Sequence, residues 1–419
     1  MNRRQFLRLL AGATAAAGGF ALESPFRPRF RIAEAALGKT LVVIFQRGGC
    51  DGLNVVVPHG DDEYYNLRPT IGIAPPNGGD PESAIDLDGF FGLHPALAPL
   101  QGIYTAGNMA VLPAVHYPTA SRSHFDSQHF MESGIKANGY EGWLNRHLGS
   151  APQTAQLRAV GFGNELPQSL RGNEVVSSFS ALANFNLGLS ATEEAELLPR
   201  LAQVYGQPAG NQPYAQLIHD FGRTTLNDLS VVNGLVSSGY SPANGAVYPN
   251  STYGRQLRET AQMIKQGTGL EVATISIGGW DTHSNQGGGQ ANGSQARRLR
   301  EFAEGINAFY TDLGTAMADV VLMTMTEFGR TARENGSFGT DHGNASAWFV
   351  VGQGINGGIY TGTGWPGLSE AQLLNGRYLQ QSIDYRDVYA ELLTSHLANT
   401  NVATVIPGYS PSPVGILNA

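Results

Sequence analysis

Apolar runs of six or seven residues recur along the chain, separated by polar and glycine-rich segments. Such continuous runs predict strands that are buried on both faces of a parallel sheet. They lie at residues 40–46, 109–115, 157–162, 271–277, 319–325 and 346–351. Helical periodicity follows at residues 295–313 and again at 385–397. Alternating strands and helices predict an α/β fold, a three-layer α/β/α sandwich with a mostly parallel central sheet.

Residues 191–268 follow another pattern. They have helical periodicity, broken by a segment rich in proline, glycine and asparagine at 240–251. We interpret 191–268 as a helical insertion or cap within one large domain that spans 37–419.

The first residues have the order of an export signal. The pair Arg3 and Arg4 precedes a weakly apolar run rich in alanine and glycine at 9–22. This order predicts a twin-arginine signal peptide over 1–36 and a periplasmic or secreted protein. The run is shorter than the roughly 20 residues that cross a bilayer, and no later segment is apolar for longer. The expectation is a mature chain without a membrane span.

Composition narrows the classes of partner. The 419 residues include 54 glycines and one cysteine, and the formal net charge is −8. An acidic chain without basic runs is a poor nucleic-acid binder, since such binding depends on neutralising phosphates. A single cysteine, Cys50, excludes an internal disulfide. No pattern specifies an oligomeric state.

Charged and imidazole side chains follow one predicted strand after another. Ligands of open parallel sheets bind beyond the carboxyl ends of the strands, so these residues are candidates for one polar site. In chain order they are Asp51, Ser123, His124, Asp281, His283, Glu327, Arg330, Asp341 and His342.

Asp281 and His283 are two residues apart after a predicted strand. In an extended segment such residues point the same way, so both can bind one metal ion. A carboxylate with an imidazole suits zinc, manganese or iron better than calcium. The alternative is an aspartate that caps a turn beside a surface histidine.

The other acidic candidates also leave two interpretations open. Asp51 follows two glycines and is either a metal ligand or an Asx-turn residue. Glu327 ends a very apolar strand, where a carboxylate needs a partner, either a metal or an arginine such as Arg330 or Arg47. Asp341 and His342 lie in a glycine-flanked segment.

Ser123 lies where a helix is expected to begin. A helix N-terminus holds anions well, but an ordinary N-cap serine has the same position. His124 is a ligand, a general base or a helix-face residue. Arg330 either clamps an oxyanion through its guanidinium or balances the carboxylates.

Five segments carry a family resemblance that extends over nearly all of the mature chain. They read LVVIFQRGGCDGLNVVVPHGD, SRSHFDSQHFMESG, GGWDTHSNQG, TEFGRTARENGSFGTDHG and DYRDVYAELL. In this order they resemble the alkaline-phosphatase/sulfatase-like superfamily, and more closely an exported branch of it that is a twin-arginine-signal domain of unknown function.

The resemblance implies roles for single residues. Asp51 would be a metal ligand, Ser123 the nucleophile, and Asp281 with His283 a ligand pair. Glu327 and Phe328 stand where the superfamily has Asp-His, and His342 matches its final histidine. Phe328 therefore replaces an expected ligand, and the spacing of Asp281 and His283 is also shorter than usual.

Two hypotheses follow. In the first, the protein is an exported metal-dependent hydrolase of small or polymer-borne phosphate or sulfate esters. It holds one or two divalent ions, zinc favoured over manganese or calcium. The expected ligands are Asp51, Asp281, His283, Glu327, Asp341 and His342, and the expected catalytic residues are Ser123, His124 and Arg330. In the second, it is a non-catalytic secreted binding or assembly protein that retains the fold and one metal ion.

Overall fold

The computed structural model describes residues 38–417, apart from 119–120, 136–138, 153–154, 156 and 213. The signal peptide expected at 1–36 lies outside the described residues. A nine-stranded sheet has the order β11-β5-β10-β9-β1-β8-β6-β7, with β12 also paired to β5. Its strands are β1 (Thr40–Arg47), β5 (Met109–His116), β6 (Ala159–Phe162), β7 (Ser177–Phe179), β8 (Val272–Gly278), β9 (Val320–Met325), β10 (Ser346–Val351), β11 (Gly358–Ile359) and β12 (Ile383–Asp384).

Strand direction confirms the predicted class. The strand β10 is antiparallel to its neighbours β5 and β9. The other pairings of this sheet are parallel. All six strands expected from apolar runs are present, with ends within two residues of the prediction. The molecule is therefore an α/β protein with a mostly parallel central sheet.

Side chains of β1 alternate between two apolar cores, one on each face of the sheet. Val42 and Ile44 belong to the core that includes residues of α9 and α10. Leu41, Val43 and Phe45 belong to the core that includes residues of α5, α6 and α11. These helices are α5 (His124–Ser133), α6 (Trp143–Ser150), α9 (Thr252–Lys265), α10 (Ser294–Leu313) and α11 (Tyr385–Glu391). The sheet is thus the middle of three layers.

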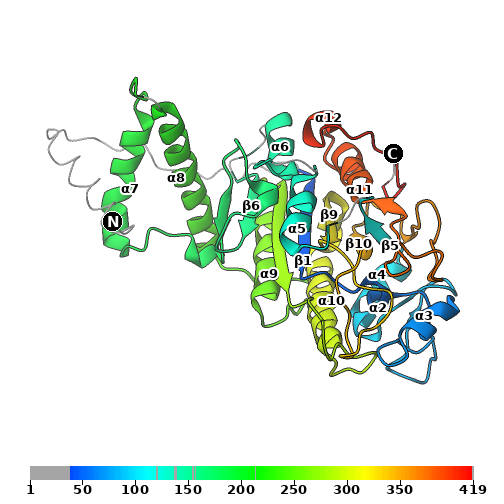
Figure 1. Cartoon of the computed structure of the whole chain (residues 1–419). Coiled ribbons are helices and arrows are strands. Elements are labelled where there is room, and N and C mark those ends of the chain that lie inside the picture. The colour runs from blue at the N-terminus through cyan, green and yellow to red at the C-terminus, as the bar shows by residue number, and fades with distance from the viewer. Residues whose placement is uncertain are drawn as a thin grey trace.

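Three helices occupy most of residues 191–268. Figure 1 shows α7 (Ala191–Gly206) and α8 (Ala215–Ser238) side by side, standing out from the rest of the molecule. Ser190 and Glu193 form a capping box at the start of α7. The third helix, α9, packs instead on β8 and α10.

Short elements complete the fold. A small three-stranded sheet consists of β2 (Val56–Val57), β4 (Gly92–Leu93) and β3 (Ile85–Asp86). The remaining α-helices are α2 (Gly52–Val55), α3 (Asp62–Leu67), α4 (Gln101–Thr105) and α12 (Val402–Val405), and short 3₁₀ and π-helical segments of three to six residues lie between them. In the part of the chain that the structure describes, no helix is long and apolar enough to cross a membrane.

Candidate metal centre

The candidate residues gather where parallel strands of the central sheet end. Asp281 follows β8 by three residues, and Glu327 follows β9 by two. Because β9, β1 and β8 are adjacent and parallel, their carboxyl ends lie at one edge of the sheet. The histidine that begins α5, His124, reaches this edge through its hydrogen bond to Glu327.

Three histidines surround the carboxylate of Asp281, and we call these four residues the histidine cluster. From Asp281 Oδ1, the distances to the Nε2 atoms are 3.1 Å for His283, 3.4 Å for His342 and 3.7 Å for His124. The Nε2 atoms of His283 and His342 are 3.1 Å apart. Among the described residues, the donor atoms of His124, Asp281 and His342 form a group that can hold a metal ion, all within 4.8 Å of one another.

The other ring nitrogen of each histidine has its own acceptor. Nδ1 of His124 lies 2.8 Å from Glu327 Oε1. Nδ1 of His283 lies 3.2 Å from Asp341 Oδ1, and Nδ1 of His342 lies 2.8 Å from the Arg122 carbonyl oxygen. Carbonyls and ionised carboxylates only accept hydrogen bonds, so each Nδ1 donates. In a neutral ring, Nε2 then carries a lone pair beside the Asp281 carboxylate, which also only accepts, so a cation between them would satisfy both. Metal-binding histidines commonly have this outer partner, which fixes tautomer and orientation.

Hydrogen bonds keep the buried carboxylate of Glu327 ionised. Burial raises its pKa, but hydrogen bonds from His124, Gln128 and the Gly48 amide outweigh burial and lower it below the usual value. Reciprocally, the hydrogen bond to Glu327 raises the pKa of His124, although burial opposes it. Glu327 therefore lies behind His124 as an outer partner.

Arg330 holds Asp281 from the interior. Its side chain is fully buried and lies 2.5 Å from Asp281 Oδ1. Burial raises the pKa of Asp281, but the Arg330 guanidinium lowers it below the usual value. Other N–H groups of Arg330 donate to the carbonyls of Gly48, Gly49, Trp280 and Thr340. This position suits a residue that orients Asp281, and it does not suit the expected oxyanion clamp.

Phe328, the residue that replaces an expected ligand, packs against the histidine cluster. Its ring centroid is 4.8 Å from those of both His124 and His342. Gly49 has a φ of +69°, and a Cβ there would lie 2.4 Å from the Phe328 ring. Only glycine fits this approach. The phenyl ring thus packs against two imidazoles at the position where the resemblance implied a ligand histidine.

Ser123 lies beside the cluster. It is the N-cap of α5, and its hydroxyl accepts the Asp126 N–H at 3.5 Å. Its two neighbours in sequence are Arg122, whose carbonyl accepts from His342, and His124. The expected nucleophile is therefore fixed between two residues that the cluster holds.

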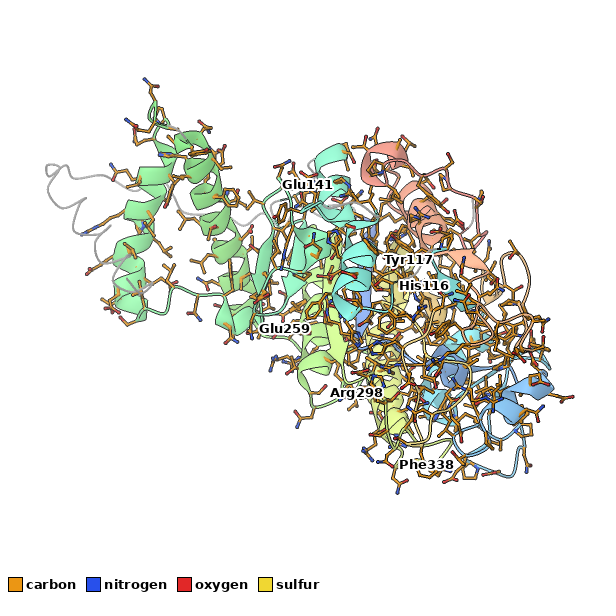
Figure 2. The ribbon with its side chains drawn as sticks, in the orientation of Figure 1. His116, Tyr117, Glu141, Glu259, Arg298 and Phe338 are labelled. Atoms are coloured by element: carbon orange, nitrogen blue, oxygen red, sulfur yellow. The ribbon has the colours of Figure 1, made fainter. Side chains whose placement is uncertain are left out.

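The end of β5 supports this serine segment. Figure 2 shows the adjacent side chains of His116 and Tyr117, whose rings stack with centroids 4.3 Å apart. His116 Nε2 lies 3.1 Å from the Glu327 carbonyl oxygen. The Tyr117 hydroxyl accepts the Ser121 N–H at 3.1 Å. Neither residue carries a sequence motif, and both connect β5 to the site.

Asp51 lies apart from the cluster. Its carboxylate is 1% exposed and forms a bidentate pair with Arg68, at 2.6 and 2.8 Å. The Gln286 amide donates a third hydrogen bond, at 2.5 Å. With both oxygens occupied by donors, Asp51 does not fit the expected role of metal ligand.

The structure thus brings together eight of the nine expected site residues. They are His124, Asp281, His283 and His342 in the cluster, Glu327 and Asp341 behind two of the histidines, Arg330 against Asp281, and Ser123 next to His124 in sequence. The ninth, Asp51, pairs with Arg68 instead. Sequence reasoning missed Arg68 and Gln286. The need of a buried Asp51 for a cationic partner was the one available signal for Arg68.

A cleft opens beside the cluster. It has a volume of about 670 Å³ and is lined by Asp341, Asn335, Arg333, Arg377 and Glu63, among others. Asp341 connects it to the cluster, because Oδ1 contacts His283 and Oδ2 contacts Arg377. The cluster side chains are themselves 26–49% exposed. A small polar ligand can therefore reach the histidines.

Comparison with known proteins gives one family match. Residues 111–408 match the family described as "Protein of unknown function (DUF1501)". No curated protein matches the sequence.

Three solved structures resemble the chain weakly. The lipoteichoic acid synthase LtaP from Listeria monocytogenes has a TM-score of 0.32 and 9% identity, over 78% of this chain and 69% of that one. Alkaline phosphatase from the Antarctic bacterium TAB5 has a TM-score of 0.30 and 9% identity, over 76% of this chain and 92% of that one. The PH0037 protein from Pyrococcus horikoshii has a TM-score of 0.29 and 11% identity, over 77% of this chain and 90% of that one. TM-scores this low assign no reaction to the chain.

Proposed function

Since the chain belongs to the DUF1501 family, whose description assigns no activity, we propose its function from the site: a metal-dependent hydrolase of phosphate or sulfate esters. One observation carries the proposal. Three imidazole Nε2 atoms converge on the carboxylate of Asp281, and each imidazole donates from Nδ1 to an outer acceptor. The donor atoms of His124, Asp281 and His342 all lie within 4.8 Å of one another, and Nε2 of His283 lies 3.1 Å from both Asp281 Oδ1 and His342 Nε2.

The donor set fits one divalent ion. His124, His283 and His342 supply nitrogen and Asp281 supplies oxygen, which favours zinc over calcium, an ion that takes oxygen ligands. Glu327 and Asp341 serve as outer partners of two histidines, so we assign a single ion. Bound there, a divalent ion supplies Lewis-acid polarisation of an ester oxygen.

The chain's own residues divide the remaining work. Arg330 holds Asp281 in place, and Phe328 excludes water from beneath two imidazoles. Ser123 is the proposed nucleophile, at the N-terminus of a ten-residue helix whose dipole favours an anionic group. In the proposed step its oxygen bonds to the phosphorus or sulfur atom as the bond from that atom to the ester oxygen breaks, and the serine proton passes to the departing alcohol. Water then cleaves the serine ester, which returns a proton to Ser123 and releases the acid.

The metal proposal is tested by elemental analysis of purified protein. We expect about one zinc per chain, lost in Asp281→Ala and in His342→Ala. The matched control is His59→Ala, since His59 also pairs with a carboxylate, at 3.0 Å from Asp86, but lies outside the cluster. Wild-type protein without a bound divalent ion after zinc loading would contradict the proposal.

The hydrolase proposal is tested with aryl phosphate, phosphodiester and aryl sulfate substrates. We expect turnover on at least one ester, lost in Ser123→Ala although zinc remains bound. Zinc binding without turnover on any of the three would favour the alternative, a secreted binding or assembly protein with one metal.

We further propose export through the twin-arginine route, supported by the pair Arg3 and Arg4 ahead of an apolar run. The test compares the periplasmic fraction for the full chain and for an Arg3→Lys/Arg4→Lys variant. Equal amounts of periplasmic protein would contradict this route.

A further inference from the structure

A buried glutamine joins Asp51 to both metal-binding loops. Gln286 is fully buried. Its Nε2 donates to Asp51 Oδ2 at 2.5 Å. Its Oε1 accepts from the hydroxyls of Thr282 and Thr340, at 2.7 and 2.9 Å. One amide therefore connects three segments that are distant in sequence.

Thr282 is adjacent in sequence to two donors of the histidine cluster, and Thr340 lies two residues before a third. Thr282 lies between Asp281 and His283, and Thr340 directly precedes Asp341 and His342. The two loops are also joined by the Thr340 N–H, which donates to the Thr282 carbonyl at 3.0 Å. A shift of either threonine is passed along the backbone to a donor-bearing residue, because consecutive Cα atoms are held about 3.8 Å apart.

The orientation of this amide is set by Asp51. A carboxylate only accepts, so the NH₂ group of Gln286 must face Asp51 and its carbonyl oxygen must face the two threonines. Asp51 in turn is fixed by the bidentate pair with Arg68. Arg68 also donates to the Ala332 and Thr331 carbonyls. The chain of contacts is thus anchored at one end by a buried ion pair.

Burial makes this chain of hydrogen bonds rigid. Asp51, Gln286 and Thr340 are at most 1% exposed, and Thr282 is 8% exposed. Water has little access to replace these bonds, and a buried polar group that loses its partner is costly. Gln286 also fastens the segment at 284–294 to the protein interior, directly after the Asp281 and His283 pair.

We propose that Asp51 and Gln286 are positioning residues that set the distance between the two loops carrying Asp281, His283 and His342. The carboxylate that the sequence suggested as a ligand acts on the metal site through an amide and two hydroxyls. This inference rests on the proposed metal-dependent function for its effect on zinc, but not for its effect on the loops.

The test uses near-isosteric variants in the full chain. Thr340→Val and Thr282→Val each remove one hydroxyl that Gln286 accepts from, and Gln286→Met removes all of these hydrogen bonds. The matched control is Thr40→Val, which deletes a buried threonine hydrogen bond of 2.6 Å to Leu270 at the opposite end of β1. All four variants are expected to unfold at a lower denaturant concentration than wild type, because each loses at least one buried hydrogen bond.

Zinc affinity, measured by competition with a chromophoric chelator, separates positioning from mere stability. We expect about a tenfold loss for each threonine variant and about a 100-fold loss for Gln286→Met, the range known for partners outside the ligand shell. Thr40→Val should bind zinc as wild type does. The two threonine variants should be non-additive, since both hydroxyls bind the same oxygen. Wild-type zinc affinity in all three site variants overturns the inference.

Hydrogen exchange of the metal-free protein tests the loops independently. The Thr340 amide should exchange faster in Gln286→Met than in wild type, and Thr40→Val should leave it unchanged. If wild-type protein binds no zinc, the proposed function fails, yet faster exchange still supports the positioning role. Unchanged exchange in Gln286→Met overturns that role whatever the zinc result.

Discussion

Asp51 and Asp281 follow two adjacent parallel strands, β1 and β8, yet their surroundings differ. Asp51 is sealed in the protein, 1% exposed, and both of its oxygens pair with Arg68. Asp281 is 49% exposed, and although its Oδ1 also meets a buried arginine, Arg330, three imidazoles surround the carboxylate. A position after a strand therefore brings a carboxylate to this edge of the sheet, but its exposure and its partners determine whether it stabilises the fold or can bind a metal ion.

The largest expected effect is on the sealed region. Asp51→Asn leaves the Arg68 charge buried without its partner, which costs about 3–5 kcal/mol of unfolding free energy. Denaturant titration measures this loss. The control is Asp319→Asn, which breaks an exposed pair with Lys39 and should cost at most about 1 kcal/mol. Equal losses in the two variants would contradict the structural role of the buried pair between Asp51 and Arg68.

The open region should respond in metal binding instead. His342→Ala removes a donor, so its zinc affinity should fall by more than the roughly 100-fold that loss of an outer partner costs. Because this side chain is partly exposed, the free energy of unfolding of the metal-free protein should change little. Chelator competition and denaturant titration on one sample measure both. A large stability loss with unchanged zinc affinity would remove the distinction between the two regions.

A smaller effect is expected at the outer partner of His124. Glu327→Gln keeps the shape but weakens the acceptor of the Nδ1 hydrogen bond, and zinc affinity should fall about 10- to 100-fold. The control is Glu132→Gln, which alters a neighbouring carboxylate that pairs with Arg47 rather than with a histidine. An equal loss in both variants would indicate a general charge effect.

The pH dependence of zinc binding should also depend on Glu327. Zinc requires neutral imidazoles, and the pKa of His124 is raised by its hydrogen bond to Glu327. Affinity should therefore keep rising with pH above the usual range of histidine, by up to about tenfold per pH unit for each displaced proton. In Glu327→Gln the rise should shift to lower pH. An identical profile in the two proteins would contradict the role of Glu327.

Much of the fold was predictable because its main strands are buried on both faces. The runs at 40–46 and 346–351 are continuous apolar sequences, and the structure has strands there. The strands β7, β11 and β12 were missed because two or three residues carry no periodicity. The reversed direction of β10 was also missed, since strand direction is set by connections rather than by residue pattern.

The candidate site was predictable in membership and less so in roles. Asp281, His283 and His342 follow strands and converge as expected. For Glu327 the sequence offered a metal ion or an arginine such as Arg330 or Arg47 as a partner, and its carboxylate instead accepts from His124, Gln128 and the Gly48 amide. Arg68 is only 17 residues from Asp51, but Gln286 is 235 away. Which buried group meets a carboxylate depends on tertiary packing, which no local pattern contains.

X-ray absorption at the zinc edge of the zinc-loaded protein tests directly whether the histidine cluster holds the metal ion. We expect the atoms bound to zinc to be mainly imidazole nitrogens at about 2.0–2.1 Å, with carboxylate oxygen and no sulfur. We also expect one imidazole fewer in His283→Ala. A shell of oxygen alone, or one unchanged by that substitution, would contradict a metal held by the histidine cluster.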